Sequence, residues 1–292
     1  MLLIEVLAGA LTLGGIYALI ALGLTLQYGV ARIMNLAHGE VMMAASFAAW
    51  ALFQAGVMNP LVAFVLALPV GFALQWLLYR GLLAPLVRRA ASPAALEVDS
   101  ILATFGLLFV VEGLMLVAFG GGYHSYSYLA KGVDLGGTSV AANRLLAAGA
   151  AAALCVAVYG VLAGTRWGTA MRAMAGAPRF APLVGIHPQA MSAIAFALGG
   201  ALAVGAGVLV SMFLPFSASM GVVFTMKALV IVILGGVGHV MGCLAAALLL
   251  ALVETLVARF IDPGLTLAAT FGIFLLVLLW RPQGLFGRRV AR

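Results

Sequence analysis

Long runs of apolar residues separated by short polar stretches dominate the pattern along this chain. A helix that crosses a bilayer needs about 20 predominantly apolar residues. Nine segments approach or reach that length: residues 2–28, 34–53, 60–78, 100–119, 145–163, 190–213, 222–234, 243–257 and 265–280. The pattern predicts an all-α polytopic membrane protein with about eight to ten transmembrane helices.

The seventh segment, residues 222–234, is too short for a full span, because it extends only about 20 Å at 1.5 Å per residue. It runs into GGVGHVMG at residues 235–242, a glycine-rich stretch that ends a helix. We expect a short broken helix whose glycine-rich end lies within protein or beside a water-lined cavity.

Composition excludes a soluble domain, since 65% of the residues are hydrophobic and 8% are charged, whereas soluble proteins average roughly 45–50% and about 25%. The 36 glycines fit close helix packing in lipid. The net charge of +7 sits in a few short loops, so no nucleic-acid partner is expected. Cys155 and Cys243 fall inside apolar segments without metal-ligand spacing. Residues 1–292 are expected to form a single transmembrane domain.

Lysine and arginine placement predicts the orientation, because cytoplasmic loops are enriched in these residues. The loop at residues 120–142 carries Lys131 beside Asp134 and is expected outside. The N-terminus is then outside as well. Three basic clusters belong on the cytoplasmic side: Arg80, Arg88 and Arg89; Arg166, Arg172 and Arg179; and Arg281, Arg288, Arg289 and Arg292.

The stretch at residues 166–189 carries arginines but no acid between two apolar segments. Its Ala- and Met-rich centre predicts a short helix that Pro178 and Pro182 end or kink. Two interpretations stay open at this point: a helix that docks into a groove of another protein, or one that lies flat on lipid headgroups. The expected outward face is small and apolar: Ala173, Met174, Ala177 and Ala181.

Three polar residues open the second apolar segment: Asn35, His38 and Glu40. Asn35 is a candidate cap for the helix that follows, and Asn35 and His38 are expected to share a face. Gly39 leaves room for a close neighbour. One interpretation is a constriction or gate in a transport pathway; the other, which the sequence favours, is interfacial hydrogen bonding near the cytoplasmic end of this span.

Glu112 lies about midway along its span and is therefore expected to face protein or water. A proton relay is one interpretation, and a hydrogen bond or ion pair to another helix is the favoured one, with Lys227 and Glu254 as candidates for such pairing. No phosphate-binding G-x-x-x-x-G-K-[ST] motif occurs in the sequence. We do not expect this chain to be an enzyme.

Four stretches resemble the LivH-type permease subunits of branched-chain amino acid ABC importers, a family that also moves hydrophobic amino acids and urea. They occur in the family's order over nearly the whole chain. The stretches are YALIALGLTLQYGVARIMNLAHGE at 17–40, RAMAGAPRFAPLVGI at 172–186, KALVIVILGGVGHVMGCLAAALLLALVE at 227–254 and RPQGLFG at 281–287.

The resemblance implies a permease subunit, in the bacterial cytoplasmic membrane, of an ATP-driven importer of branched-chain amino acids. It implies a second permease of LivM type, two cytoplasmic ATPase subunits and a soluble substrate-binding protein. ATP and magnesium are then used by the ATPases, and this chain needs no cofactor.

By the same resemblance, residues 166–188 form the coupling segment that docks on an ATPase. The positions that match the docking segment are Arg172, Ala173, Met174, Ala177, Arg179, Ala181 and Gly185. The candidate pathway or gate residues remain Asn35, His38, Glu40, Glu112 and Lys227.

Two alternatives remain at this level. The first is an ABC permease for urea or another small amide or aromatic solute, which these motifs do not separate from an amino-acid permease. The second is a proton-coupled secondary transporter that uses His38, Glu40 and Glu112. The chain also departs from the family pattern at His239, which stands where relatives often carry a small residue, and in the breaks at Pro178 and Pro182.

Overall fold

The computed structural model describes residues 2–134, 139–178, 180–281 and 284–286. Short 3-10 or π turns connect several of the helices: η1 (Tyr79–Leu83), η2 (Ala181–Val184), η3 (Ala218–Met220) and η4 (Pro263–Leu265). One antiparallel hairpin is present: β1 (Gly132–Asp134) and β2 (Ser139–Ala141). The α-helices are α1 (Leu2–Ala31), α2 (His38–Gln54), α3 (Pro60–Leu78), α4 (Ala84–Arg89), α5 (Pro93–Phe119), α6 (Ala142–Gly164), α7 (Arg166–Gly176), α8 (Pro188–Ser211), α9 (Gly221–Gly235), α10 (Val240–Phe260) and α11 (Thr266–Trp280).

The all-α prediction is confirmed, with the small hairpin as the exception. Within the described residues, eight helical segments are long and apolar enough to cross a membrane. The predicted apolar segment that is not among these eight is residues 34–53, which forms α2, a helix of only 17 residues. The predicted short broken helix is α9, which has 15 residues and ends at Gly236, where φ is +94°.

Helix α8 forms the centre of the molecule, and its apolar stretch is 89% buried. It packs against α1, α2 and α3. Glycines allow this close approach, since a Cβ at Gly199 would overlap the carbonyl oxygen of Gly23, and one at Gly207 would overlap that of Met42. Helices α3, α5, α6 and α11 are largely exposed and form the periphery.

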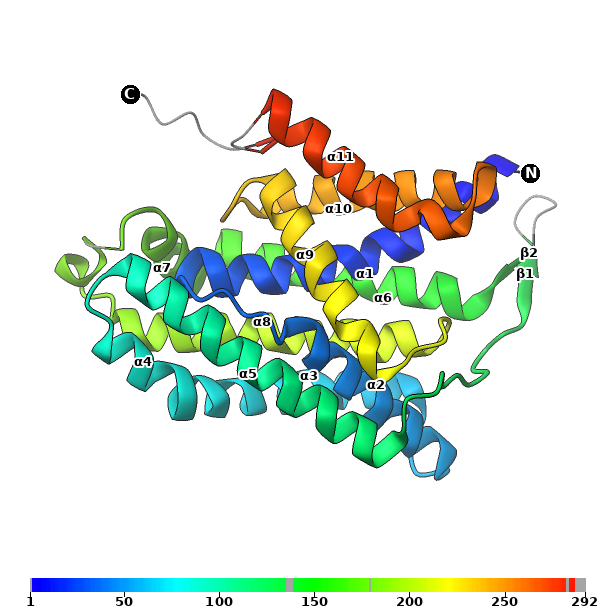
Figure 1. Cartoon of the computed structure of the whole chain (residues 1–292), viewed down its shortest axis with the longest axis horizontal. Helices are drawn as coiled ribbons and strands as arrows, with labels where there is room; N and C mark the ends of the chain where they lie inside the picture. The colour runs from blue at the N-terminus through cyan, green and yellow to red at the C-terminus, as the bar shows by residue number, and fades with distance from the viewer. Residues whose placement is uncertain (1, 135–138, 179, 282–283, 287–292) are drawn as a thin grey trace.

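The two ends of the molecule differ in charge. Figure 1 shows α4 and α7 together at one end, and the start of α1 and the hairpin at the other. The described arginines of the first two basic clusters therefore share an end, as the predicted orientation requires. Arg281 follows α11, whose C-terminal end points the same way.

At the end opposite the arginines, an aromatic side chain of α2 packs against aromatic side chains from other parts of the chain. Phe47 stacks on Phe119 with ring centroids 4.7 Å apart and meets the Phe216 ring edge-on at 5.0 Å. The loop that follows α5, residues 120–131, is held to this cluster, because His124 and Phe216 exchange backbone hydrogen bonds of 2.8 and 3.0 Å. Tyr126 in the same loop shares a 2.9 Å hydrogen bond with Ser211, and burial raises the pKa of its phenol.

Candidate functional site

A non-helical link, residues 32–37, joins α1 to α2 and turns back into the molecule. Asn35 anchors it, because its Nδ2 donates to Gln27 Oε1 at 3.1 Å and its Oδ1 accepts from the amide of Ala37 at 3.1 Å. Gln27 in turn donates to the carbonyl oxygen of Phe196 at 3.1 Å. Asn35 thus supports the turn before α2, as expected, although the residue at the helix cap itself is Ala37.

Two threonines complete the hydrogen bonding of this link. The Thr104 hydroxyl accepts from the Leu36 amide at 3.1 Å and lies 3.0 Å from the carbonyl oxygen of Met34. The Thr225 hydroxyl accepts from the Gly39 amide at 2.8 Å and lies 3.2 Å from the carbonyl oxygen of Leu36. Non-helical backbone at membrane depth needs such partners, because lipid supplies none.

His38 fixes the depth at which α2 begins. Its Nε2 lies 3.0 Å from the carbonyl oxygen of Ile20, near the middle of α1. Asn35 and His38 both face α1 and are fully buried, so they share a surface as predicted. Both side chains form hydrogen bonds, as the favoured interpretation expects: Asn35 lies beside Gln27 in the last turns of α1, and His38 lies nearer the middle of that helix. Their interfacial position stays a prediction.

The first turns of α2 and α9 meet at two glycines. A Cβ at Gly39 would overlap the carbonyl oxygen of Gly221. The Glu40 carboxylate lies against the α9 N-terminus at Gly221 and Val222, where the helix dipole favours a negative charge. Neither oxygen of Glu40 completes a hydrogen bond within the described part of the chain. Glu112 on α5 is half-buried and interacts electrostatically with Glu40.

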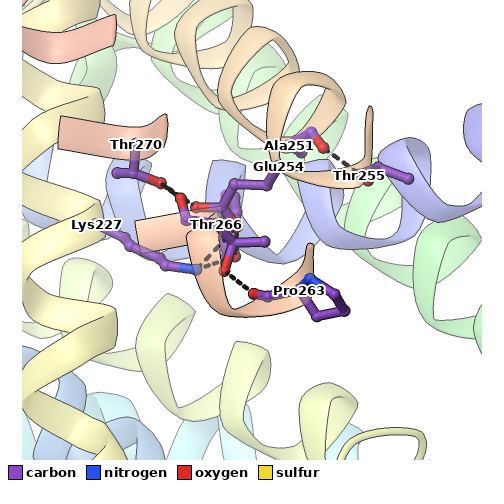
Figure 2. Close-up of polar contacts among 8 residues, drawn as sticks. Lys227, Ala251, Glu254, Thr255, Pro263, Thr266 and Thr270 are labelled. Atoms are coloured by element: carbon purple, nitrogen blue, oxygen red, sulfur yellow. Dashed lines mark hydrogen bonds and ion pairs between the residues drawn. The ribbon is translucent and has the colours of Figure 1, made fainter. Parts of the chain in front are cut away.

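A buried ion pair joins the helices on the other side of α9. Lys227 Nζ lies 2.9 Å from Glu254 Oε2 and donates to the Tyr17 hydroxyl at 2.6 Å, and that hydroxyl donates to the same carboxylate oxygen at 2.6 Å. Thr270 donates to the other oxygen of Glu254, and Figure 2 shows the three side chains of Lys227, Glu254 and Thr270 converging. The expected pairing between helices is confirmed for Lys227 and Glu254, which pair with each other and hold α1, α9, α10 and α11 together. Glu112 forms no ion pair with any described residue.

Residues 166–188, the predicted coupling segment, fold as their turn chemistry predicts. The Thr165 side chain caps α7 by accepting from the Gly168 amide at 3.1 Å. The helix ends at Gly176, two residues before Pro178. The 3-10 turn η2 follows, and Gly185 ends it with φ of +77°. The segment therefore consists of the helix α7 and a separate turn at residues 180–185, which we call the tip.

The predicted outward face of this segment is only partly correct. Met174 is buried, at 4% exposure, because α7 packs one side on α1, α6 and α8. Ala181, the first residue of η2, is also buried, at 2% exposure. Met171 lies on the same inner face. Arg179 lies outside the described residues. The positions of the predicted set that are exposed or half-exposed are Arg172, Ala173, Ala177 and Gly185.

Larger apolar side chains, which the sequence reading missed, dominate the exposed surface of the segment. Leu183 is 81% exposed, Val184 74% and Phe180 67%. Trp167 on α7 is also exposed. Their signal in the sequence is the apolar run FAPLV inside an otherwise arginine-rich loop, which a solvated connector would not need.

His239, the departure from the family pattern, has a structural role. Its Nδ1 accepts from the Gly242 amide at 3.1 Å and caps α10. Its ring also stacks on Phe286 at 5.8 Å.

Comparison with known proteins places this geometry in a family context. Residues 6–280 match the family described as branched-chain amino acid transport system, permease component. The high-affinity branched-chain amino acid transport system permease protein LivH of Escherichia coli is 30% identical, and the alignment covers 95% of this chain and 93% of the relative. LivH of Salmonella typhimurium is 29% identical with the same coverage. The corresponding permease BraD of Pseudomonas aeruginosa is 28% identical over 98% of this chain and 96% of its own. No solved structure gives a significant match.

Proposed function

The chain belongs to the family of permease components of branched-chain amino acid transport systems, and on this premise we propose that it carries branched-chain amino acids into the cell as one subunit of an ATP-driven importer. It is a multi-pass, non-catalytic membrane component of a transport complex. The proposed partners are a second permease of LivM type, two cytoplasmic ATPase subunits and a soluble binding protein.

The observation that carries the proposal is the exposed apolar tip of the coupling segment. Phe180, Leu183 and Val184 extend from a short turn at the arginine-rich end of the molecule. Large apolar anchors surrounded by charge are typical of docking surfaces. The alternative of a helix lying flat on headgroups fits less well, because the exposed tip spans a single 3-10 turn of four residues.

A hydrogen bond connects this segment to the link between α1 and α2. Arg32 Nη2 donates to the carbonyl oxygen of Ala175 in α7 at 3.3 Å. Arg32 also begins the link to α2 and holds a left-handed backbone with φ of +56°. A shift of α7 would therefore reach the starts of α2 and α9 through this link.

We place the passage on the face where that link meets α5 and α9. Met34, Leu36 and Glu112 are half-buried there. A carboxylate and non-helical backbone at membrane depth are poor neighbours for lipid and are tolerated beside protein or water. Asn35, His38 and Glu40 are buried behind this face and position it. Lys227 instead forms the ion pair with Glu254.

These positions of the docking segment and the passage suggest how the proposed transport cycle works. ATP closes the two ATPases, and their movement shifts the docked segment and the helices packed on it as rigid bodies. Coupling requires that the docking contacts differ in free energy between the two states. The passage itself need hold its solute only weakly, because tight binding would slow release.

The test is the substitution Leu183→Asp in the full complex. We expect uptake and substrate-stimulated ATPase activity to fall roughly tenfold or more, because a charge replaces a central apolar anchor. The permease itself should keep its thermal stability, since Leu183 contacts solvent. Tyr123→Asp, at a 77% exposed position in the opposite loop, is the matched control and should have little effect. Full activity of the Leu183→Asp complex would show that the tip does not dock.

A further inference from the structure

A basic cavity of about 580 Å³ lies between α3, η1, α4 and the start of α8, apart from the coupling tip. Arg80, Arg88 and His187 line it, and no carboxylate is among the described residues that do so. Neither arginine belongs to an ion pair in the described part of the chain. The cavity therefore presents positive charge without an internal counter-charge.

The N-terminus of α8 opens into the same cavity. An α-helix leaves its first amides without intrahelical partners, and the side chain of the cap residue, His187, does not satisfy them. Gln189 and Ala190 from this first turn line the cavity. Helix N-termini bind phosphate groups for this reason, through free amides and the positive end of the helix dipole.

The wall formed by η1 provides an independent indication of a ligand. Tyr79 lines the cavity and is 2% exposed, yet its hydroxyl completes no hydrogen bond with any described residue. Ser192 lies near this hydroxyl without completing a hydrogen bond, and the charge of Arg88 also acts on it. A buried hydroxyl without a partner costs free energy, and a ligand oxygen would remove that cost. Tyr79 also begins a π-helical turn, a local distortion often found at functional sites.

The surface that leads away from the cavity is suited to acyl chains. Val62, Val65, Pro69 and Ala73 are exposed and follow one face of α3 toward Trp76 at the cavity rim. The Arg80 guanidinium stacks over the Trp76 ring at 3.8 Å. An apolar stripe that ends in an aromatic residue and then in arginines matches the change from acyl chains to headgroups.

We propose that this cavity binds the phosphate of an anionic phospholipid from the cytoplasmic leaflet, with its acyl chains along the exposed face of α3. Arg80 and Arg88 contact the phosphate oxygens, and the first amides of α8 complete the site. Basic cavities between helices on the cytoplasmic side are typical of such lipid sites. Because α8 begins three residues after Gly185, the bound lipid would steady the joint between the coupling segment and the membrane.

Native mass spectrometry of the delipidated protein, titrated with defined lipids, tests the proposal. We expect phosphatidylglycerol to bind several times more tightly than phosphatidylcholine. The double variant Arg80→Gln/Arg88→Gln should lower phosphatidylglycerol binding about tenfold. Arg89→Gln is the matched control, because Arg89 is exposed on α4 and does not line the cavity; it should bind like the wild type.

Tyr79→Phe keeps the ring and removes only the hydroxyl, so it tests the site without risk to the fold. A two- to threefold weaker binding of phosphatidylglycerol is expected. Equal binding of the two lipids, or unchanged binding by the double variant, would overturn the site. Displacement of the lipid by millimolar inorganic phosphate would assign the cavity to a free anion and overturn the lipid assignment.

Discussion

Lys227 and Glu254 carry opposite charges in a place where either charge alone would be costly. Their side chains are 12% and 4% exposed, and each is within hydrogen-bond distance of the Tyr17 hydroxyl. A buried pair of this kind gives little net stability compared with apolar packing, but removal of one partner leaves an uncompensated charge. The two residues therefore depend on each other.

Glu254→Gln should destabilise the protein by about 3–5 kcal/mol, because the Lys227 ammonium loses its counter-charge in a buried position. The measurement is thermal unfolding of the purified chain in detergent, followed by circular dichroism. The double variant Lys227→Met/Glu254→Gln should recover most of this loss, since it leaves no unpaired charge.

The control for this prediction is Glu5→Gln, which breaks the ion pair of Glu5 with Arg259 at 3.2 Å. Both side chains of that pair are about half exposed, so the expected loss is under about 1 kcal/mol. Equal losses from Glu254→Gln and Glu5→Gln would contradict the interpretation of the buried pair.

Some features of single residues could be predicted from the sequence, and others could not. Glu112, Lys227 and Glu254 stand out in any apolar segment, because charge at membrane depth is rare. Lys227 and Glu254 were candidates for pairing on these grounds, but the distance between them depends on the packing of α9 against α10. The exposed apolar surface of Phe180, Leu183 and Val184 was not predicted, because the expected docking face consisted of small residues.

At the scale of elements, the link between α1 and α2 is the least regular part of the membrane region. Thr104 on α5 and Thr225 on α9 bind its backbone groups, and Gln27 on α1 accepts a hydrogen bond from the side chain of Asn35 in the link. Each of these helices is therefore held to the link by at least one polar contact.

Thr225→Val should destabilise the protein by about 1–3 kcal/mol, because it keeps the side-chain shape and leaves the Gly39 amide and the Leu36 carbonyl oxygen without their partner. Thermal unfolding in detergent measures the effect. Thr255→Val is the matched control, since the Thr255 hydroxyl donates only to the carbonyl oxygen of Ala251 in its own helix. A loss no larger than that of the control would argue against a supporting role for Thr225.

Local chemistry predicted some element ends and not others. Pro178 indicated the end of α7, and the glycines after residue 234 indicated the end of α9. The start of α2 deep in the molecule was not predictable, because it depends on contacts with α1, α5 and α9. An apolar segment of about 20 residues looks the same whether it starts at the interface or at mid-depth.

At the scale of the whole molecule, the described residues form seven further long apolar helical segments around or beside the buried α8, and the arginine-bearing helices α4 and α7 lie at one end. This much followed from hydropathy and arginine placement. The proposed passage face did not, because it depends on how α2, α5 and α9 pack around the link between α1 and α2. We propose that the whole molecule is a conduit without its own energy source.

Solute uptake by proteoliposomes tests that proposal most directly. Vesicles that contain the chain with its permease, ATPase and binding-protein partners should accumulate a labelled branched-chain amino acid only when ATP is available to the ATPases. Vesicles with the chain alone should not concentrate the solute, with or without an inward proton gradient. Accumulation by the chain alone under a proton gradient would contradict the account and identify a proton-coupled transporter.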